Sequence, residues 1–275
     1  MKKITIPSLQ EKKSKKKKIK CLTAYDAIMA KILDDSGVDI ILVGDSLGMV
    51  VQGKQNTLSV TMNDMKYHTR IVASAVSNAL VIADMPFLSY HGLIEDAVLN
   101  AGSFLQECGA DAVKVEGGEA VIDIVYDMVE LGIPVMGHVG LTPQKVKQYG
   151  GFKTQGKTTA EAKTILTDAK LLEEAGTFAI IAEGIPAELG KKLAKEISVP
   201  IIGIGAGPYT DGQILVINDL IGLTEYVPGF AKQYCNMKEV VSKSVAEYML
   251  DIDNGKFPVP PDKEKDNMKH LKSIK

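Results

Sequence analysis

The chain has few cysteines and no long apolar segment. Its 275 residues include only three cysteines, Cys21, Cys108 and Cys235, an odd number at wide spacing. This pattern argues against a disulfide framework and a CxxC zinc site, and it favours a reducing compartment. No run of about 18 apolar residues is present, so we expect no transmembrane helix. The N-terminal segment lacks the apolar core of a secretory signal. We therefore expect a cytoplasmic protein with no membrane partner.

The chain also lacks an excess of charge of one sign. It has 32 Lys and Arg against 34 Asp and Glu, a formal net charge of −2. No overall field therefore favours nucleic acid or an anionic membrane, and we expect neither as a partner. Charge is concentrated only in the lysine run from Lys12 to Lys20. We expect this run to be a solvated segment before the first strand, because the rest of the chain supplies no basic surface to extend it.

The chain does contain a regular alternation of short apolar runs and helical patterns. Seven runs are typical of buried strands: KIKCLTA, DIILVGD, LVIAD, AVKVE, IPVMGHVG, FAIIAE and PIIGIGA. An eighth strand is expected near Ile214 to Ile217. Eight strand–helix units in roughly 250 residues predict a single (β/α)₈ TIM barrel. An open doubly wound sheet is the alternative, but no linker divides the chain before Asp251. We expect a basic segment over 1–20, the barrel over 21–250 and a tail over 251–275.

The segments between the strands predict helices with defined ends. Apolar residues at i, i+3 and i+4 spacing predict a helix from Ile94 to Cys108, with Gly109 ending it. Thr158-x-x-Glu161 is a capping box that opens another helix. Pro186 is expected in the first turn of the next. A last helix is expected over about 236–250.

The predicted strands end on polar residues that one site could share. In order, these residues are Asp45 with Ser46, Asp84, Lys114 with Glu116, His138 and Glu183. The carboxyl ends of barrel strands meet on one rim, where active sites lie. Because side chains alternate along a strand, Lys114 and Glu116 share a face. If the acids face the barrel axis, four carboxylates crowd one small mouth.

Crowded carboxylates predict a bound divalent cation. Like charges close together do not all stay ionised unless a cation holds them, and one lysine is too few for four acids. All-oxygen ligands with open positions favour Mg²⁺. We expect Asp45 and Asp84 to bind it and Glu116 to contribute directly or through water. Taken singly, these residues have structural explanations: Asp45 as a helix cap, Lys114 and Glu116 as an ion pair, His138 as a backbone-bonded imidazole. Recurrence on five successive strands favours one site.

The glycine-rich turn after the seventh strand, Gly203-Ile204-Gly205-Ala206-Gly207, could bind an anion through backbone N–H groups. It matches neither common nucleotide-binding motif, and tight packing explains it equally well.

Long ordered motifs carry a specific resemblance. LTAYDA, DIILVGDSLGMVVQG, MNDMKYHTR, NALVIADMPFLSY, GADAVKVEGG, GIPVMGHVGLTPQ, EEAGTFAIIAEGIPAEL and PIIGIGAGPYTDGQILVINDLIGL are similar to the ketopantoate hydroxymethyltransferase family. The similarity extends from about Cys21 to Lys232. It implies a (β/α)₈ barrel, Mg²⁺, and transfer of a one-carbon unit from 5,10-methylenetetrahydrofolate to 3-methyl-2-oxobutanoate. The product would be 2-dehydropantoate (ketopantoate), formed through a Mg-stabilised enolate in pantothenate biosynthesis. Bacterial members are typically homodecamers.

The resemblance also implies residue roles. Asp45, Asp84 and Glu116 would lie at the metal. The substrate would contact Asp45 and Asp84 as well as Ser46 and Lys114, and Glu183 would be the proton acceptor. From its place among these residues, we also expect His138 to bind the substrate by donating a hydrogen bond to one of its oxygens. The family usually has Cys-Val after that glutamate, where this chain has Gly184-Ile185.

Two other functions remain open at this stage. The same metal–enolate barrel could act as a C–C lyase or a phosphoenolpyruvate mutase, or a non-catalytic barrel could bind a keto acid. No motif marks a folate pocket, so the folate co-substrate is expected from the resemblance alone.

Overall fold

The computed structural model describes residues 3–259 and places eight parallel strands in a closed barrel. Each strand pairs with the next along the chain, and β8 pairs with β1 to close the sheet. The strands are β1 (Ile19–Thr23), β2 (Ile40–Val43), β3 (Leu80–Asp84), β4 (Ala112–Lys114), β5 (Val135–Gly140), β6 (Ala179–Glu183), β7 (Ile201–Ile204) and β8 (Gly212–Leu215). The predicted (β/α)₈ barrel is confirmed.

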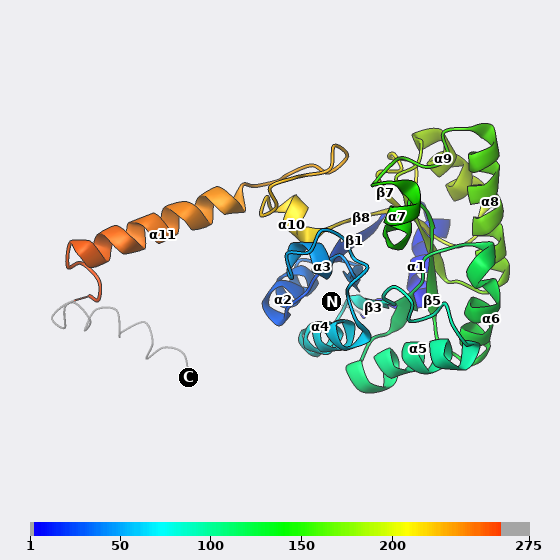
Figure 1. The fold of residues 1–275 in the computed structure, drawn as a ribbon, viewed down its shortest axis with the longest axis horizontal. Helices are drawn as coiled ribbons and strands as arrows, with labels where there is room; N and C mark the ends of the chain where they lie inside the picture. The colour runs from blue at the N-terminus through cyan, green and yellow to red at the C-terminus, as the bar shows by residue number, and fades with distance from the viewer. Residues whose placement is uncertain (1–2, 260–275) are drawn as a thin grey trace. The chain divides into compact units, whose positions relative to one another are not determined.

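Within residues 3–217, helices between the strands cover the outside of the barrel (Figure 1), and the structure describes further helices before and after it. They are α1 (Ile6–Ser14), α2 (Ala27–Asp35), α3 (Leu47–Val50), α4 (Met62–Ala75), α5 (Ile94–Cys108), α6 (Ile122–Glu130), α7 (Val146–Tyr149), α8 (Thr159–Glu174), α9 (Ala187–Glu196), α10 (Ile217–Leu220) and α11 (Met237–Asp253), with the 3₁₀ turns η1 (Glu119–Val121) and η2 (Pro143–Lys145). Among residues 3–259, none of these helices combines the length and apolar character needed to cross a bilayer.

The predicted helix ends agree closely with the structure. Helix α5 ends at Cys108, and Gly109 follows in the left-handed conformation, with φ of 74°. The capping box at the start of α8 is present: Thr158 accepts from the backbone of Glu161, whose side chain accepts from the backbone of Thr158. The expectation for Pro186 is wrong by one residue, because its ψ of 141° is extended and makes it the N-cap of α9.

The eighth strand lies two residues earlier than predicted. Its first residues, Gly212 and Gln213, pair with Ile202 and Gly203 of β7. Neither glycine nor glutamine is typical of a strand, so the apolar pattern placed the element too far along the chain. Ile217, predicted to be in this strand, begins α10 instead.

The inward faces of the strands form one apolar core. Its strand residues are Ile19, Cys21, Ile40, Leu42, Leu80, Ile82, Ala112, Met136, Ala179, Ile181, Ile202 and Ile214. Side chains alternate along a strand, so the same face continues toward the carboxyl ends at Asp84, Lys114 and Glu183. The predicted alternation is confirmed, and it directs these polar groups to the barrel axis.

The N-terminal segment is structured, in contrast to the expectation of a solvated run. Leu9 of α1 is fully buried and packs against the amino-terminal residues of the barrel core. Lys13 donates hydrogen bonds of 2.8–3.2 Å to the carboxylate of Asp211 and to three backbone carbonyl oxygens, those of Ala194, Ile197 and Val199. Lysines in this run therefore fix α1 to the barrel. The polar-rich sequence concealed this, because one apolar residue supplies the buried contact.

The chain divides into two compact units, residues 1–217 and 218–275. The second unit contains α11, which begins after the N-cap residue Asn236 as expected and extends three residues beyond the predicted end. The division into segment, barrel domain and tail at residues 20 and 250 stays a prediction. Most of the predicted tail, residues 260–275, lies outside the described residues.

Candidate active site

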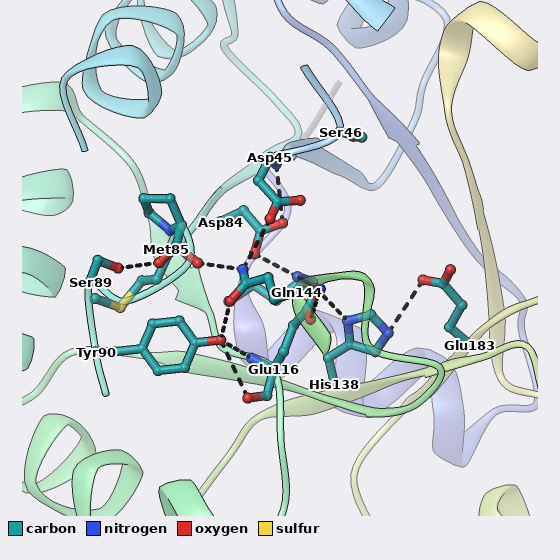
Figure 2. Close-up of polar contacts among 12 residues, drawn as sticks. Asp45, Ser46, Asp84, Met85, Ser89, Tyr90, Glu116, His138, Gln144 and Glu183 are labelled. Atoms are coloured by element: carbon teal, nitrogen blue, oxygen red, sulfur yellow. Dashed lines mark hydrogen bonds and ion pairs between the residues drawn. The ribbon is translucent and has the colours of Figure 1, made fainter. Parts of the chain in front are cut away.

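The polar residues predicted from the strand ends lie together at the carboxyl end of the barrel (Figure 2). Asp84, Lys114 and Glu183 are the last residues of their strands, and His138 lies within β5. Asp45 and Ser46 follow β2, and Glu116 follows β4. Five side chains are buried with no more than 3% of their surface exposed: Asp45, Asp84, Lys114, Glu116 and His138. The strand-end reasoning therefore identified one contiguous buried cluster.

Lys114 is the cation at the centre of this cluster. Its Nζ donates a 2.5 Å hydrogen bond to Asp84 Oδ1 and lies 3.6 Å from Glu116 Oε1. Burial would lower the pKa of Lys114, but the carboxylates of Asp84, Glu116 and Asp45 outweigh it and raise the pKa above its ordinary value. Lys114 is therefore charged throughout the physiological range and neutralises only part of the acidic cluster.

The acids differ in how well this charge is compensated. Burial and repulsion from Asp84 and Glu116 raise the pKa of Asp45 well above its ordinary value. Burial also raises the pKa of Asp84, despite its contact with Lys114. For Glu116 burial is outweighed by Lys114 and His138, so its pKa is lowered. Asp45 and Asp84 are thus the carboxylates whose negative charge lacks compensation.

His138 lies between two carboxylates on opposite sides of its ring (Figure 2). Its Nδ1 is 3.6 Å from Glu116 Oε1, and its Nε2 is 3.3 Å from Glu183 Oε2. Neither contact has hydrogen-bond geometry. Burial lowers the pKa of the imidazole, but the two flanking carboxylates outweigh it and raise the pKa to about 9. The ring is therefore an imidazolium at neutral pH.

The sequence analysis missed three polar residues around this cluster. Gln144 and Tyr90 are buried and hydrogen-bonded to its acids and to each other. The Tyr25 hydroxyl lies 2.9 Å from Ser46 Oγ, a hydrogen bond that orients the serine. None of the three ends a strand, so the strand-end pattern does not find them. In the sequence alone, they look like polar residues of the surface.

The acidic cluster is closely packed, and the nearby cavity reaches it at one residue. A cavity of about 280 Å³ lies beside β5 and the first turns of α8. Its lining includes His138, Lys145, Tyr149 and Asp168, but none of the other predicted site residues. Among residues 3–259, no three acidic, histidine or cysteine side chains are arranged to hold a metal ion by themselves.

Comparison with known proteins decides the family. The sequence model described as ketopantoate hydroxymethyltransferase matches residues 3–260, nearly the whole chain. The chain belongs to the ketopantoate hydroxymethyltransferase family. It is 51% identical over 257 residues to the 3-methyl-2-oxobutanoate hydroxymethyltransferase of Syntrophus aciditrophicus (strain SB), covering 93% of this chain and 94% of the relative. It is 50% identical over 271 residues to the Clostridium botulinum (strain Alaska E43 / Type E3) protein of that name, covering 98% of each. The resemblance inferred from the motifs is confirmed, and the chain is a hydroxymethyltransferase.

Solved structures with the same fold are more distant in sequence than these members of the family. A phosphonopyruvate hydrolase complex with oxalate and Mg²⁺ has a TM-score of 0.64 at 14% identity, covering 98% of both chains. A 2,3-dimethylmalate lyase, described as a PEP mutase/isocitrate lyase superfamily member, has a TM-score of 0.57 at 15% identity, covering 91% of this chain and 98% of that one. At this identity the likeness shows the fold, which a ketopantoate hydroxymethyltransferase shares with these enzymes.

We expect protonation of His138 to stabilise the metal-free fold in a defined pH range. Its folded pKa of about 9 exceeds the ordinary 6.5. The stabilisation is therefore fully present below about pH 6.5 and is lost as the pH rises through 9. The difference in unfolding free energy between the wild type and His138→Gln should shrink across this range in urea unfolding with EDTA present. His91→Gln, which changes an exposed ring with a lowered pKa, is the control. A pH-independent difference for His138→Gln would contradict the protonated ring.

Proposed function

We propose that the protein transfers a hydroxymethyl group from 5,10-methylenetetrahydrofolate to 3-methyl-2-oxobutanoate, giving 2-dehydropantoate for pantothenate biosynthesis. The observation that carries the proposal is the cluster of the buried Asp45, Asp84 and Glu116 and the partly exposed Glu183 around Lys114 and His138. Relatives about half identical in sequence are named for this reaction's keto-acid substrate. The folate donor follows from the family resemblance.

The donor groups fit a hard divalent cation. Asp45 and Asp84 offer buried carboxylate oxygens, and burial raises the pKa of each. A positive charge beside them would stabilise their ionised forms. We propose that both hold Mg²⁺, with substrate and water completing its coordination. Glu116 fits contact through water, because its Oε2 accepts the Gln144 N–H and its Oε1 faces Lys114 and His138. A bound Mg²⁺ would supply Lewis acidity that makes the C3–H of the keto acid easier to ionise.

The remaining polar groups would position the keto acid. Lys114 lies beside Asp84 and would offset the negative charge that the substrate brings. Ser46 would donate its hydroxyl proton to the substrate carboxylate, with its orientation fixed by Tyr25. The protonated His138 would donate a hydrogen bond to a substrate oxygen. Together these donors would hold C3 of the keto acid toward Glu183.

Glu183 would act as the general base. It is more exposed than the other acids, with 17% of its side chain accessible, and it faces His138 across 3.3 Å. In the step, the C3–H bond breaks and its proton moves to Glu183, while its electron pair forms the new bond to the methylene carbon. Both C–N bonds that join this carbon to N5 and N10 of the folate break, and the oxygen of one water molecule bonds to it as the hydroxyl group. The proton held by Glu183 and one proton of the water pass to the two folate nitrogens, and tetrahydrofolate leaves.

The proposal also covers location and assembly. The cytoplasmic location expected from cysteine usage stays a prediction. We propose a homo-oligomer, because none of the 17 residues of α11 is buried within the single chain, although the helix carries Val241, Val245 and Tyr248. Most of the stability of a helix in a protein comes from packing its apolar face, so α11 needs a packing partner.

The assembly prediction can be checked directly. Light scattering after size exclusion should give a mass that is a multiple of 29.6 kDa. A monomer across the micromolar range would contradict it.

The reaction itself is tested by product formation. Purified protein should form 2-dehydropantoate, detected by mass spectrometry, only when keto acid, methylenetetrahydrofolate and Mg²⁺ are all present. Chelation with EDTA should lower the rate about 10²-fold or more, and added Mg²⁺ should restore it. The alternative, a C–C lyase or a phosphoenolpyruvate mutase-like enzyme, predicts turnover of its own substrates without folate. Folate-independent cleavage or phosphoryl rearrangement, with no 2-dehydropantoate, would overturn the proposal.

The base is tested by isotope exchange. Glu183→Gln should slow exchange of the C3 hydrogen of 3-methyl-2-oxobutanoate with D₂O by about 10²–10⁴-fold, measured by NMR with Mg²⁺ and no folate. Glu174→Gln changes an exposed acid of α8 and should leave exchange unaltered. Exchange at the wild-type rate in Glu183→Gln would remove this residue from the role.

A further inference from the structure

Gln144 joins three of the segments that carry the acidic cluster (Figure 2). It lies in η2 and is 4% exposed. Its backbone N–H donates a 3.0 Å hydrogen bond to Glu116 Oε2. Its side-chain Nε2 donates to Asp45 Oδ2 at 3.0 Å and to the carbonyl oxygen of Met85 at 2.9 Å. Because Met85 directly follows Asp84, this one residue contacts the segments at the ends of β2, β3 and β4.

Tyr90 fixes which way the Gln144 amide points. The fully buried Tyr90 oxygen accepts the N–H of Glu116 at 3.1 Å, and its hydroxyl donates to Gln144 Oε1 at 2.7 Å. The amide then has both N–H groups and its oxygen satisfied. A flipped amide would set its oxygen against the Asp45 carboxylate and the Met85 carbonyl, two repulsive contacts. The hydrogen-bond network therefore holds Gln144 as a donor toward Asp45.

Gln144 occupies one carboxylate oxygen of Asp45 and one of Glu116 with hydrogen bonds. Oδ2 of Asp45 is occupied by Gln144, whereas Oδ1 accepts no hydrogen bond from any residue within 3–259. Oε2 of Glu116 is likewise occupied by the Gln144 backbone. In Asp84, by contrast, Oδ1 accepts from Lys114 and Oδ2 from the Asp45 backbone N–H at 3.2 Å. Gln144 thus sets which Asp45 oxygen is available to a ligand.

We propose that Gln144, held by Tyr90, is the positioning residue for the metal. Its side-chain amide occupies Oδ2 of Asp45 and leaves Oδ1 available to the metal, while its backbone N–H holds Oε2 of Glu116 in place. This role rests on the proposed function of Asp45 and Asp84. Residues that orient metal ligands typically change metal affinity about 10–100-fold when replaced. The polar contacts of the Gln144 side chain, and not its volume, carry the effect.

Metal binding without substrates tests the role. Mn²⁺ is a spectroscopic substitute for Mg²⁺ at oxygen ligands, and its free concentration is measured by electron paramagnetic resonance. Gln144→Met keeps the side-chain length and the backbone N–H but removes the amide. It should weaken Mn²⁺ binding about 10–100-fold. Tyr90→Phe keeps the ring and removes the hydroxyl that orients the amide, and it should weaken binding by a smaller factor.

Two further variants serve as controls for the Mn²⁺ measurement. Gln155→Met changes a glutamine whose amide, within residues 3–259, bonds only to the Lys153 carbonyl, and it should bind Mn²⁺ as the wild type does. Asp84→Asn shows the effect of a lost ligand. Wild-type affinity in folded Gln144→Met overturns the positioning role and leaves the proposed reaction standing. If Gln144→Met does not fold, wild-type affinity in Tyr90→Phe overturns it equally. A wild-type protein that binds no Mn²⁺ refutes the metal site, and this role with it.

Discussion

The meeting of four carboxylates at one barrel mouth, three of them buried, is the constraint on which the site depends. Asp45, Asp84, Glu116 and Glu183 meet there, and the cations among them are Lys114 and the His138 imidazolium. Even beside these cations, burial raises the pKa of Asp45 and of Asp84. In the proposed function, a divalent ion would supply further positive charge beside these two acids. Burying these acids without such an ion costs free energy, and this cost favours the binding of a metal at the site.

A buried acid elsewhere in the barrel shows what a structural carboxylate looks like. Asp34 of α2 is 1% exposed, but it accepts hydrogen bonds from the backbone N–H groups of Ser77, Asn78 and Ala79. Burial raises its pKa, yet these donors outweigh burial and the pKa is lowered. Asp34 fixes the turn that enters β3. The Asp45 carboxylate accepts from the Gln144 amide and lies near the acids Asp84 and Glu116. A buried carboxylate in such surroundings is typical of a functional site.

The sequence predicted the parts of this structure that follow from periodicity. Alternation along strands placed Asp84, Lys114 and Glu183 on the inward face, and parallel pairing brought them to one rim. Contacts between segments that are distant in the sequence have no periodic pattern by which the sequence could predict them. Gln144 lies in a loop turn, and its partner Tyr90 lies between β3 and α5, so only the folded chain brings them together. Helix α1 escaped prediction because its one fully buried residue, Leu9, lies in a mostly polar stretch with no helical apolar pattern.

The position of α1 has a consequence for solvent. With Leu9 packed against the first residues of the strands, the amino end of the barrel is closed by side chains. The proposed site lies at the opposite end of the barrel, so the apolar core would separate a bound keto acid from solvent on its inner side. In the proposed reaction, the folate and the reacting water would therefore approach the keto acid from the rim.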